Sequence, residues 1–304
     1  MTFQQLKYFI ETVNCGSISQ ASKNLYVTQP SLSKAIKELE ADIGIDLFTR
    51  TSKGITLTTD GIEFLGYARQ VAEQTSLLEQ RYLNKKPSRN LCSISTQHYS
   101  FAVNAFVNMV KKTSAEEYEF TLRETRTYEI IEDVKTLRSD LGILYTSPFN
   151  RKVIEKLLCE NNLAFNPLFI AKPHIFVSVA NPLATKKFVI PKDLECYPCL
   201  SFEQGEYNSF YFSEEILSTA FNKKSIRVSD RATIFNLMIG LNGYTISTGI
   251  LSSDLNGKEI TAVPLKVNDF IEVGWIAHDS IQLTKQASMY VKELKRVVAK
   301  YSEP

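Results

Sequence analysis

Short polar and basic side chains gather between Thr28 and Lys37, where they could make hydrogen bonds and charge contacts. The residues that carry this chemistry are Thr28, Gln29, Pro30, Ser31, Ser33, Lys34 and Lys37. Small donors suit the edges of DNA bases, and lysines suit phosphates. Lysine acts as a point charge and lacks the planar fork of arginine. Lys34 and Lys37 are therefore expected to hold phosphate rather than to read guanine.

A second set of polar residues stands at the predicted ends of strands in the last two thirds of the chain. The set is Ser95, Thr96, Gln97, Tyr145, Thr146, Ser201, Phe202, Gln204 and Thr248. Ligands of open α/β sheets bind at the carboxyl ends of the strands. Hydroxyl and amide donors with few cations suit a small carboxylate, a sulfate or an amino acid, above all beside a helix N-terminus. The alternative for each residue is a strand-end group satisfied within the fold.

Other kinds of chemistry find little support. The chain has no GxSxG, GxxxxGK[ST] or HExxH motif, so an enzyme is not expected. Its five cysteines, an odd number, indicate free thiols in a reducing compartment. Cys196 and Cys199 have the spacing of a redox or metal motif, but no second ligand pair accompanies them. We therefore expect no metal and no cofactor, and keep a thiol- or metal-responsive protein as an alternative.

The polar residues after Thr28 need a helix to present them. Thr28 can act as an N-cap and Pro30 fits a first helical turn, so a helix is predicted from about Gln29 to Gly44. Its apolar face is Leu32, Ala35, Ile36 and Leu39. A preceding helix begins at Ser17 and a first one is capped by Thr2 and Gln5. This is a helix-turn-helix pattern, and the alternative is an ordinary helical hairpin with a solvated face.

A small hairpin follows these helices. Residues 47–51 and 55–58 read as strands and residues 52–54 as the turn between them. Arg50, Thr51 and Lys53 lie at its tip, where the wing of a winged helix contacts phosphate or the minor groove. An exposed hairpin without a partner is the other interpretation.

Residues 1–60 resemble the DNA-binding domain of LysR-type transcriptional regulators. The matching residues are Phe9, Ser17, Ala21, Leu25, Thr28 to Ser33, Ile36, Leu39, Glu40, Gly44, Leu47, Phe48, Arg50, Leu57, Thr58 and Gly61. The resemblance implies that Gln29 to Lys34 face the bases of double-stranded DNA. It also implies a small-molecule effector, a homodimer that pairs further into a dimer of dimers, and a possible contact with RNA polymerase.

A long helical stretch from about Thr59 to Tyr82 carries an apolar stripe that must be covered. The stripe is Ile62, Leu65, Ala68, Ala72 and Leu78. The small core of the preceding domain is already filled by its three helices and wing, so a second copy of this helix is the expected partner. This resembles the linker helix of the family, which pairs antiparallel in the dimer. A hinge is expected at 85–89, where Pro87 breaks the helix.

The remaining residues alternate between strand and helix patterns. Strands at 91–95, 118–123 and 141–145 enclose helices at 101–112 and 128–138, which indicates a parallel sheet covered by helices. A second series has strands at 174–180, 198–202 and 244–247 and helices at 210–222 and 233–241, and a strand at 270–277 and a helix at 284–300 close the chain. Two lobes with crossings near Pro167 and Asn268 resemble the family's effector domain, which is like a periplasmic binding protein. The Ser95-Thr96-Gln97 run is similar to the pocket of the family's cysteine-biosynthesis regulators.

The expected fold is multidomain: a mainly α winged helix-turn-helix at 1–58, a linker helix and hinge at 59–90, and an α/β effector domain at 91–304. Lobe I would span 91–166 and 269–304, and lobe II 167–268. Residues 1–90 hold 11 basic and 9 acidic side chains, which accounts for the whole-chain net charge of +2. Without a signal peptide or an apolar run of membrane-spanning length, a cytoplasmic protein is expected. A stand-alone solute-binding protein is the remaining alternative.

Overall fold

The computed structural model describes residues 1–51, 54–82, 90–207, 209–220, 222–251 and 257–301. The chain divides into two compact units, Met1–Ser88 and Arg89–Pro304. No helix in the described part of the chain is long and apolar enough to cross a membrane. The expected hinge at 85–89 lies outside the described residues.

The first unit contains three short helices, a hairpin and a long helix. They are α1 Phe3–Cys15, α2 Ile18–Asn24, α3 Gln29–Ile43, β1 Phe48–Thr51, β2 Gly54–Leu57 and α4 Thr59–Tyr82. The predicted caps are present: Thr2 and Gln5 form a capping box, and the Thr28 hydroxyl accepts from the backbone of Ser31. α3 ends at Gly44, whose φ of 74° is the left-handed conformation that glycine adopts without strain.

The core of this unit includes part of α4, which the sequence did not predict. Leu65 and Ala68 are buried against the cluster of Leu6, Phe9, Leu39 and Leu47. Ile62 and Leu78 are 63% and 57% exposed, so the expected single stripe is in fact divided between two faces of α4. The assumption that the domain core was complete without this helix is wrong, because Leu65 and Ala68 close its open side.

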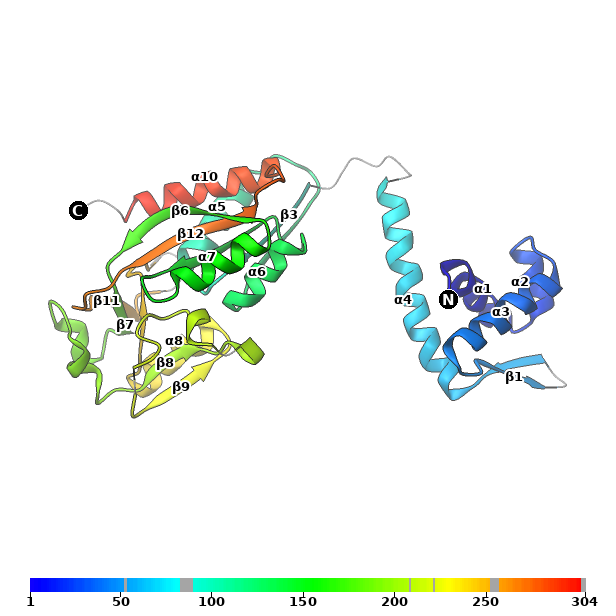
Figure 1. The fold of residues 1–304 in the computed structure, drawn as a ribbon, viewed down its shortest axis with the longest axis horizontal. Helices are drawn as coiled ribbons and strands as arrows, with labels where there is room; N and C mark the ends of the chain where they lie inside the picture. Colours follow the sequence, from blue (N-terminus) through cyan, green and yellow to red (C-terminus); the bar gives the residue numbers. More distant parts are fainter. Residues whose placement is uncertain (52–53, 83–89, 208, 221, 252–256, 302–304) are drawn as a thin grey trace. The chain divides into compact units, whose positions relative to one another are not determined.

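The second unit begins with a five-stranded sheet, lobe I. Its elements are β3 Asn90–Thr96, α5 Ser100–Lys112, β4 Tyr118–Glu124, α6 Thr127–Lys135, β5 Leu141–Thr146, α7 Arg151–Glu160, β6 Leu163–Ala171, β12 Ile271–His278 and α10 Lys285–Ala299. The strand order is β4-β3-β5-β12-β6, with β3 parallel to β4 and β5. α5 and α10 cover one face, and α6 and α7 cover the other (Figure 1). The predicted βαβαβ start is confirmed.

A second five-stranded sheet forms lobe II. Its elements are β7 His174–Ser178, β8 Cys199–Phe202, β9 Ser225–Val228, α8 Arg231–Leu241, β10 Tyr244–Ser247 and β11 Ile260–Pro264, with short 3-10 helices at Pro182–Thr185, Pro191–Leu194, Gly205–Tyr207 and Phe210–Phe212. The strand order is β11-β7-β10-β8-β9. The predicted crossing at Pro167 is wrong, because Pro167 lies inside β6 and pairs with Gly274. The chain enters lobe II after Ala171 and returns before Ile271.

The helix predicted for 210–222 is also wrong. The described residues of this segment form one short 3-10 helix, Phe210–Phe212, followed by turns, and Leu217 has a φ of 59°. The carboxylates of Glu214 and Glu215 bond to backbone N–H groups of two other elements. These tertiary bonds outweigh the weak local preference for helix.

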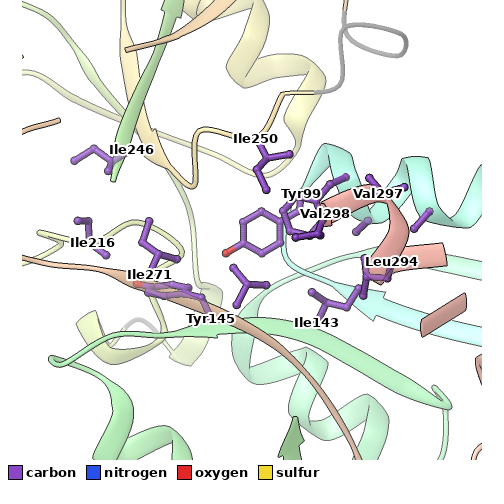
Figure 2. Packing of buried hydrophobic residues seen from close by; sticks show 14 of the residues in the cluster. Tyr99, Ile143, Tyr145, Ile216, Ile246, Ile250, Ile271, Leu294, Val297 and Val298 are labelled. Atoms are coloured by element: carbon purple, nitrogen blue, oxygen red, sulfur yellow. The ribbon is translucent and has the colours of Figure 1, made fainter. Parts of the chain in front are cut away.

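The two lobes share one hydrophobic core. Figure 2 shows Tyr99, Tyr145 and Ile271 of lobe I among Ile216, Ile246 and Ile250 of lobe II. The lobes are therefore held in contact by buried apolar surface, and their facing edges form the cleft described below.

Candidate DNA interface and interlobe cleft

The start of α3 separates apolar from polar residues as the sequence predicts. Leu32 and Leu39 are fully buried and Ile36 is 4% exposed. The predicted DNA-contacting residues that stand exposed are Thr28, Gln29, Pro30, Ser31, Lys34 and Lys37, and Ser33 is half-buried. A polar face of α3 is thus exposed on the surface of the first unit.

Local hydrogen bonds fix the first turn of this helix. The hydroxyls of Thr28 and Ser31 lie 2.8 Å apart, and the Ser31 N–H donates to the Thr28 hydroxyl at 3.3 Å. Lys34 has its Nζ 3.8 Å from a carboxylate oxygen of Glu38, one turn later. An ion pair this exposed is weak in water, so Lys34 can readily exchange Glu38 for a phosphate.

Tyr26, in the turn before α3, was not predicted as a site residue. Its side chain is 96% exposed. Its φ is 54°, and this left-handed backbone conformation is unfavourable for a residue with a bulky side chain. A large aromatic ring held in water beside α3 is placed to contact the same partner. The sequence signal was an aromatic residue inside a helix-turn-helix turn.

The hairpin of β1 and β2 is the predicted wing. The strands pair antiparallel, with Arg50 opposite Ile55 and Thr51 opposite Gly54. One oxygen of the Glu40 carboxylate accepts from the backbone N–H groups of Leu47 at 2.8 Å and Phe48 at 3.2 Å, which ties the wing to α3. Lys53 lies outside the described residues, and of Arg50 and Thr51 only the backbone positions are described.

In the second unit, Gln97 is the centre of a buried hydrogen-bond network. Its Oε1 accepts from the Tyr145 N–H at 3.0 Å and the Tyr99 hydroxyl at 3.1 Å, and its Nε2 donates to the Thr127 hydroxyl at 2.6 Å. The Thr127 N–H then donates to Gln204 Oε1 at 3.2 Å. Gln97, Tyr145 and Gln204, predicted as ligand contacts, are thus brought together across the lobes.

Several other predicted contacts are buried and internally bonded. Ser95 donates to Asp133 at 2.6 Å, and Thr96 donates to the carbonyl of Gln97 at 2.8 Å. The Thr146 hydroxyl donates to Glu272 at 3.3 Å, and the Thr248 hydroxyl accepts from the Ile250 N–H at 3.3 Å. These four side chains bond to the protein in this structure and do not line its described cavities.

The cleft instead presents a buried pair that sequence reasoning missed. The Glu214 carboxylate accepts from the His98 N–H at 3.0 Å and lies 3.0 Å from the His98 Nδ1. The two side chains are 4% and 5% exposed. The His98 ring stacks on Phe202 with centroids 3.9 Å apart and planes at 6°. The free space left here, between His98, Glu214 and Arg231, is only about 30 Å³.

The electrostatics of the pair follow from its burial. Burial alone lowers the pKa of His98, but the charge of Glu214 and its hydrogen bond outweigh it and the pKa is raised. Glu215, beside it, has its pKa raised to about 8, first by burial and then by the charge of Glu214. At neutral pH Glu215 is therefore mostly protonated, and Glu214 is the carboxylate paired with His98.

A larger cavity of about 580 Å³ adjoins the cleft within lobe II. Ser201, Phe202 and Gln204, three of the predicted contacts, line it together with Tyr244 and Arg227. It lies where the predicted helix at 210–222 is replaced by turns. Its size falls in the range of about 300–1,000 Å³ that small-molecule pockets occupy.

Burial makes two of the cysteine thiols, those of Cys92 and Cys199, poorly reactive. All five are free, and burial raises the pKa of Cys199 to about 11 and that of Cys92 to about 12. A thiol with a raised pKa is a poor nucleophile and metal ligand. In the described part of the chain no three His, Cys, Asp or Glu side chains form a metal-binding group.

Comparisons with known proteins agree with the helix-turn-helix. Residues 3–62 match the model described as "Bacterial regulatory helix-turn-helix protein, lysR family". The chain is 44% identical over 73 residues to the HTH-type transcriptional regulator TcbR of Pseudomonas sp. (strain P51), a match that covers 24% of this chain and 25% of TcbR. It is 29% identical over 316 residues to the uncharacterized HTH-type transcriptional regulator YoaU of Bacillus subtilis (strain 168), covering 98% and 99% of the two chains.

Solved structures show the same fold along the whole chain. Full-length CbnR complexed with its target DNA has a TM-score of 0.54 and 19% identity, covering 98% of this chain and 100% of that one. A Corynebacterium glutamicum OxyR C206 mutant has a TM-score of 0.52 and 16% identity, covering 98% and 94%. Residues 3–62 are therefore a helix-turn-helix domain of the LysR family, and the chain is similar along its whole length to HTH-type transcriptional regulators.

Proposed function

We propose that this regulator reads a specific operator with the first turns of α3 and that a small anion bound in the interlobe cleft controls it. The observation that carries the first part is the exposed row Gln29, Pro30 and Ser31 above the buried Leu32 and Ile36. Gln29 is suited to a bidentate contact with adenine, and Lys34 and Lys37 to phosphates on either side. We assign the DNA-binding role to 1–58, the linker to 59–90 and the effector-binding role to 91–304.

Operator reading requires two copies of the chain. Tyr67, Val71, Leu78 and Tyr82 lie on one exposed face of α4, separate from the face that carries Leu65 and Ala68. Their spacing of four, seven and four residues is that of a helix-helix seam. We propose that two copies of α4 pair through this face, presenting two α3 helices to a nearly palindromic site, and that such dimers pair again and meet RNA polymerase.

The second part of the proposal concerns control. His98 of lobe I meets Glu214 and Phe202 of lobe II in the cleft, and Thr127 links Gln97 to Gln204 across the lobes. A ligand that binds there favours one arrangement of these contacts over another, and only such a difference in affinity can shift the regulator between two states. Small carboxylates, sulfate and sulfur-containing amino acids are the classes to test first. The raised pKa of Cys199 counts against the alternative of a thiol-responsive regulator.

The test of operator reading compares two exposed glutamines. Gln29→Ala removes a proposed base contact, whereas Gln4→Ala changes an exposed glutamine of α1. Loss of a base contact costs about 1–3 kcal/mol, which is roughly 5- to 150-fold in affinity. Fluorescence anisotropy with the upstream DNA of the gene should show this loss for Gln29→Ala and wild-type binding for Gln4→Ala. Equal affinities for the two variants would remove Gln29 from the interface.

A further inference from the structure

The start of α5 is a ready position for an anion. α5 has 13 residues, and its N-cap residue Tyr99 makes no side-chain capping bond. The backbone N–H of His98 lies just before it, and an imidazolium at His98 adds a positive charge and a second donor. We name these two donors, the His98 N–H and the His98 Nδ1, the His98 anion site.

The chain places a carboxylate of its own in this site. Glu214 comes from lobe II, 116 residues further along the chain, and both of its oxygens lie 3.0 Å from His98 Nδ1. The Glu214 side chain is only 5% exposed, so its pair with His98 is shielded from water. Glu214 accepts both hydrogen bonds that His98 offers, from its N–H and from its Nδ1, so another carboxylate is the replacement that restores both.

The segment that carries Glu214 is held by contacts on either side of it. The Tyr145 hydroxyl donates to the Ser213 carbonyl at 2.9 Å, and the Phe202 N–H donates to the Glu215 carboxyl at 3.0 Å. The remaining space of about 30 Å³ holds no more than a water-sized group, so an effector enters only if Glu214 leaves. The cavity of about 580 Å³ shares Phe202 and Glu215 with the cleft and gives room for that change.

We propose that Glu214 is an internal ligand of the His98 anion site and that the effector is a small carboxylate that displaces it. This rests on the proposed function, because it places the effector in the same cleft. A carboxylate on the effector makes the same two hydrogen bonds to His98 that Glu214 makes. A compound without a carboxylate restores neither this pair of hydrogen bonds nor the negative charge of Glu214, and does not compete.

The experiment uses the full-length protein and acetate as the probe. Glu214→Ala vacates the site, and acetate should then fill it, so 50 mM sodium acetate should raise the midpoint of thermal unfolding by at least 3 °C over equal sodium chloride. Wild type should show no such difference. Glu203→Ala is the matched control, because Glu203 also bridges the lobes through an ion pair with Arg126 but lies outside the His98 anion site. No acetate-specific rise in folded Glu214→Ala, or an equal rise in Glu203→Ala, overturns the proposal.

A second variant covers the case in which Glu214→Ala fails to fold. Glu214→Gln keeps the size of the side chain and removes its charge, so the pKa of His98, followed by NMR of the ring nitrogens, should fall by at least one unit. An unchanged His98 pKa overturns the proposal. DNA binding is measured separately with the wild type: its absence would overturn the proposed function, whereas the acetate and NMR results test the His98 anion site alone.

Discussion

Glu214 and Glu215 are neighbours in sequence and have opposite roles in the cleft. Glu214 is paired with His98 in lobe I, whereas Glu215 bonds within lobe II to the backbone of Phe202 and to Ser213. Burial and the negative charge of Glu214 both raise the pKa of Glu215, so Glu215 is protonated more readily than an exposed glutamate. Glu214 thus bridges the two lobes, whereas Glu215 stays within lobe II.

The raised pKa of Glu215 predicts how stability depends on pH. Its pKa rises from an unfolded value near 4.5 to about 8 when the protein folds, so the folded state binds more protons between these values. Stability contributed by this group is therefore complete below about pH 4.5 and is lost as pH rises toward 8. Glu215→Gln keeps the acceptor and removes the titration.

Urea denaturation at pH 6 and pH 8 checks this. The wild type should lose stability relative to Glu215→Gln by about 1 kcal/mol per pH unit, an order-of-magnitude figure from the linkage relation. His98, whose pKa is also raised, acts in the same direction in both proteins and cancels in the comparison. A constant difference between the two proteins would show that Glu215 does not titrate in this range.

At the same scale, the sequence predicted the exposed face of α3 better than the contacts of the cleft. Gln29 and Lys34 could be placed on the exposed face of α3 because the N-cap of this helix and the spacing of its apolar residues are local properties of the sequence. Gln97 was found as a strand-end donor, but its partners Thr127 and Tyr145 depend on the packing of three elements. Glu214 could not be found, because its partner lies 116 residues away and its surrounding segment lacks a regular pattern.

At the scale of the element, α4 has two apolar faces, one buried and one exposed. One face closes the core of the first unit through Leu65 and Ala68. The exposed face contains Val71 and Leu78. The apolar pattern predicts the helix but does not separate its two faces, because that separation depends on how α1 packs against α4.

This division predicts the effect of a charge on each face. Leu78→Asp, on the exposed face, should turn the dimer into a monomer, because a carboxylate in a helix-helix seam is buried without a partner. Ile62→Asp is the control, because Ile62 is similarly exposed but points to another side of the helix. Light scattering after gel filtration measures both. A dimer that survives in Leu78→Asp would place the seam elsewhere.

Two glycines of α4 give a matched test of its packing. A methyl group at Gly61 would lie 2.2 Å from the Leu47 carbonyl oxygen, whereas one at Gly66 would meet nothing within 4 Å. Gly66→Ala should stabilise the helix by about 0.5–1 kcal/mol. Gly61→Ala should destabilise the first unit by about 2 kcal/mol or more, since backbone must move. Thermal unfolding measures both, and equal effects would mean that α4 does not approach Leu47 so closely.

At the scale of the whole molecule, two units with separate cores are expected to unfold separately. The clusters around Phe9 and Leu32 belong to Met1–Ser88, and that around Tyr290 belongs to Arg89–Pro304. Calorimetry of the full-length chain should therefore show two transitions. Gly61→Ala should lower one of them and Glu215→Gln should move only the other. A single transition shifted by both variants would mean that the units unfold together.

The core that lobes I and II share limits the routes by which a small molecule can enter the cleft. Tyr99 and Tyr145 are buried against Ile216, Ile246 and Ile250, so swinging the lobes apart would wet this apolar surface at about 25 cal/mol for each Å². The turns after Phe212 are held by hydrogen bonds and by the apolar side chains of Ile216 and Leu217, so moving them exposes less of this apolar surface than parting the lobes. We therefore expect a ligand to enter the cleft through these turns. The rate of ligand uptake should follow the local opening of the turns rather than the unfolding of either lobe.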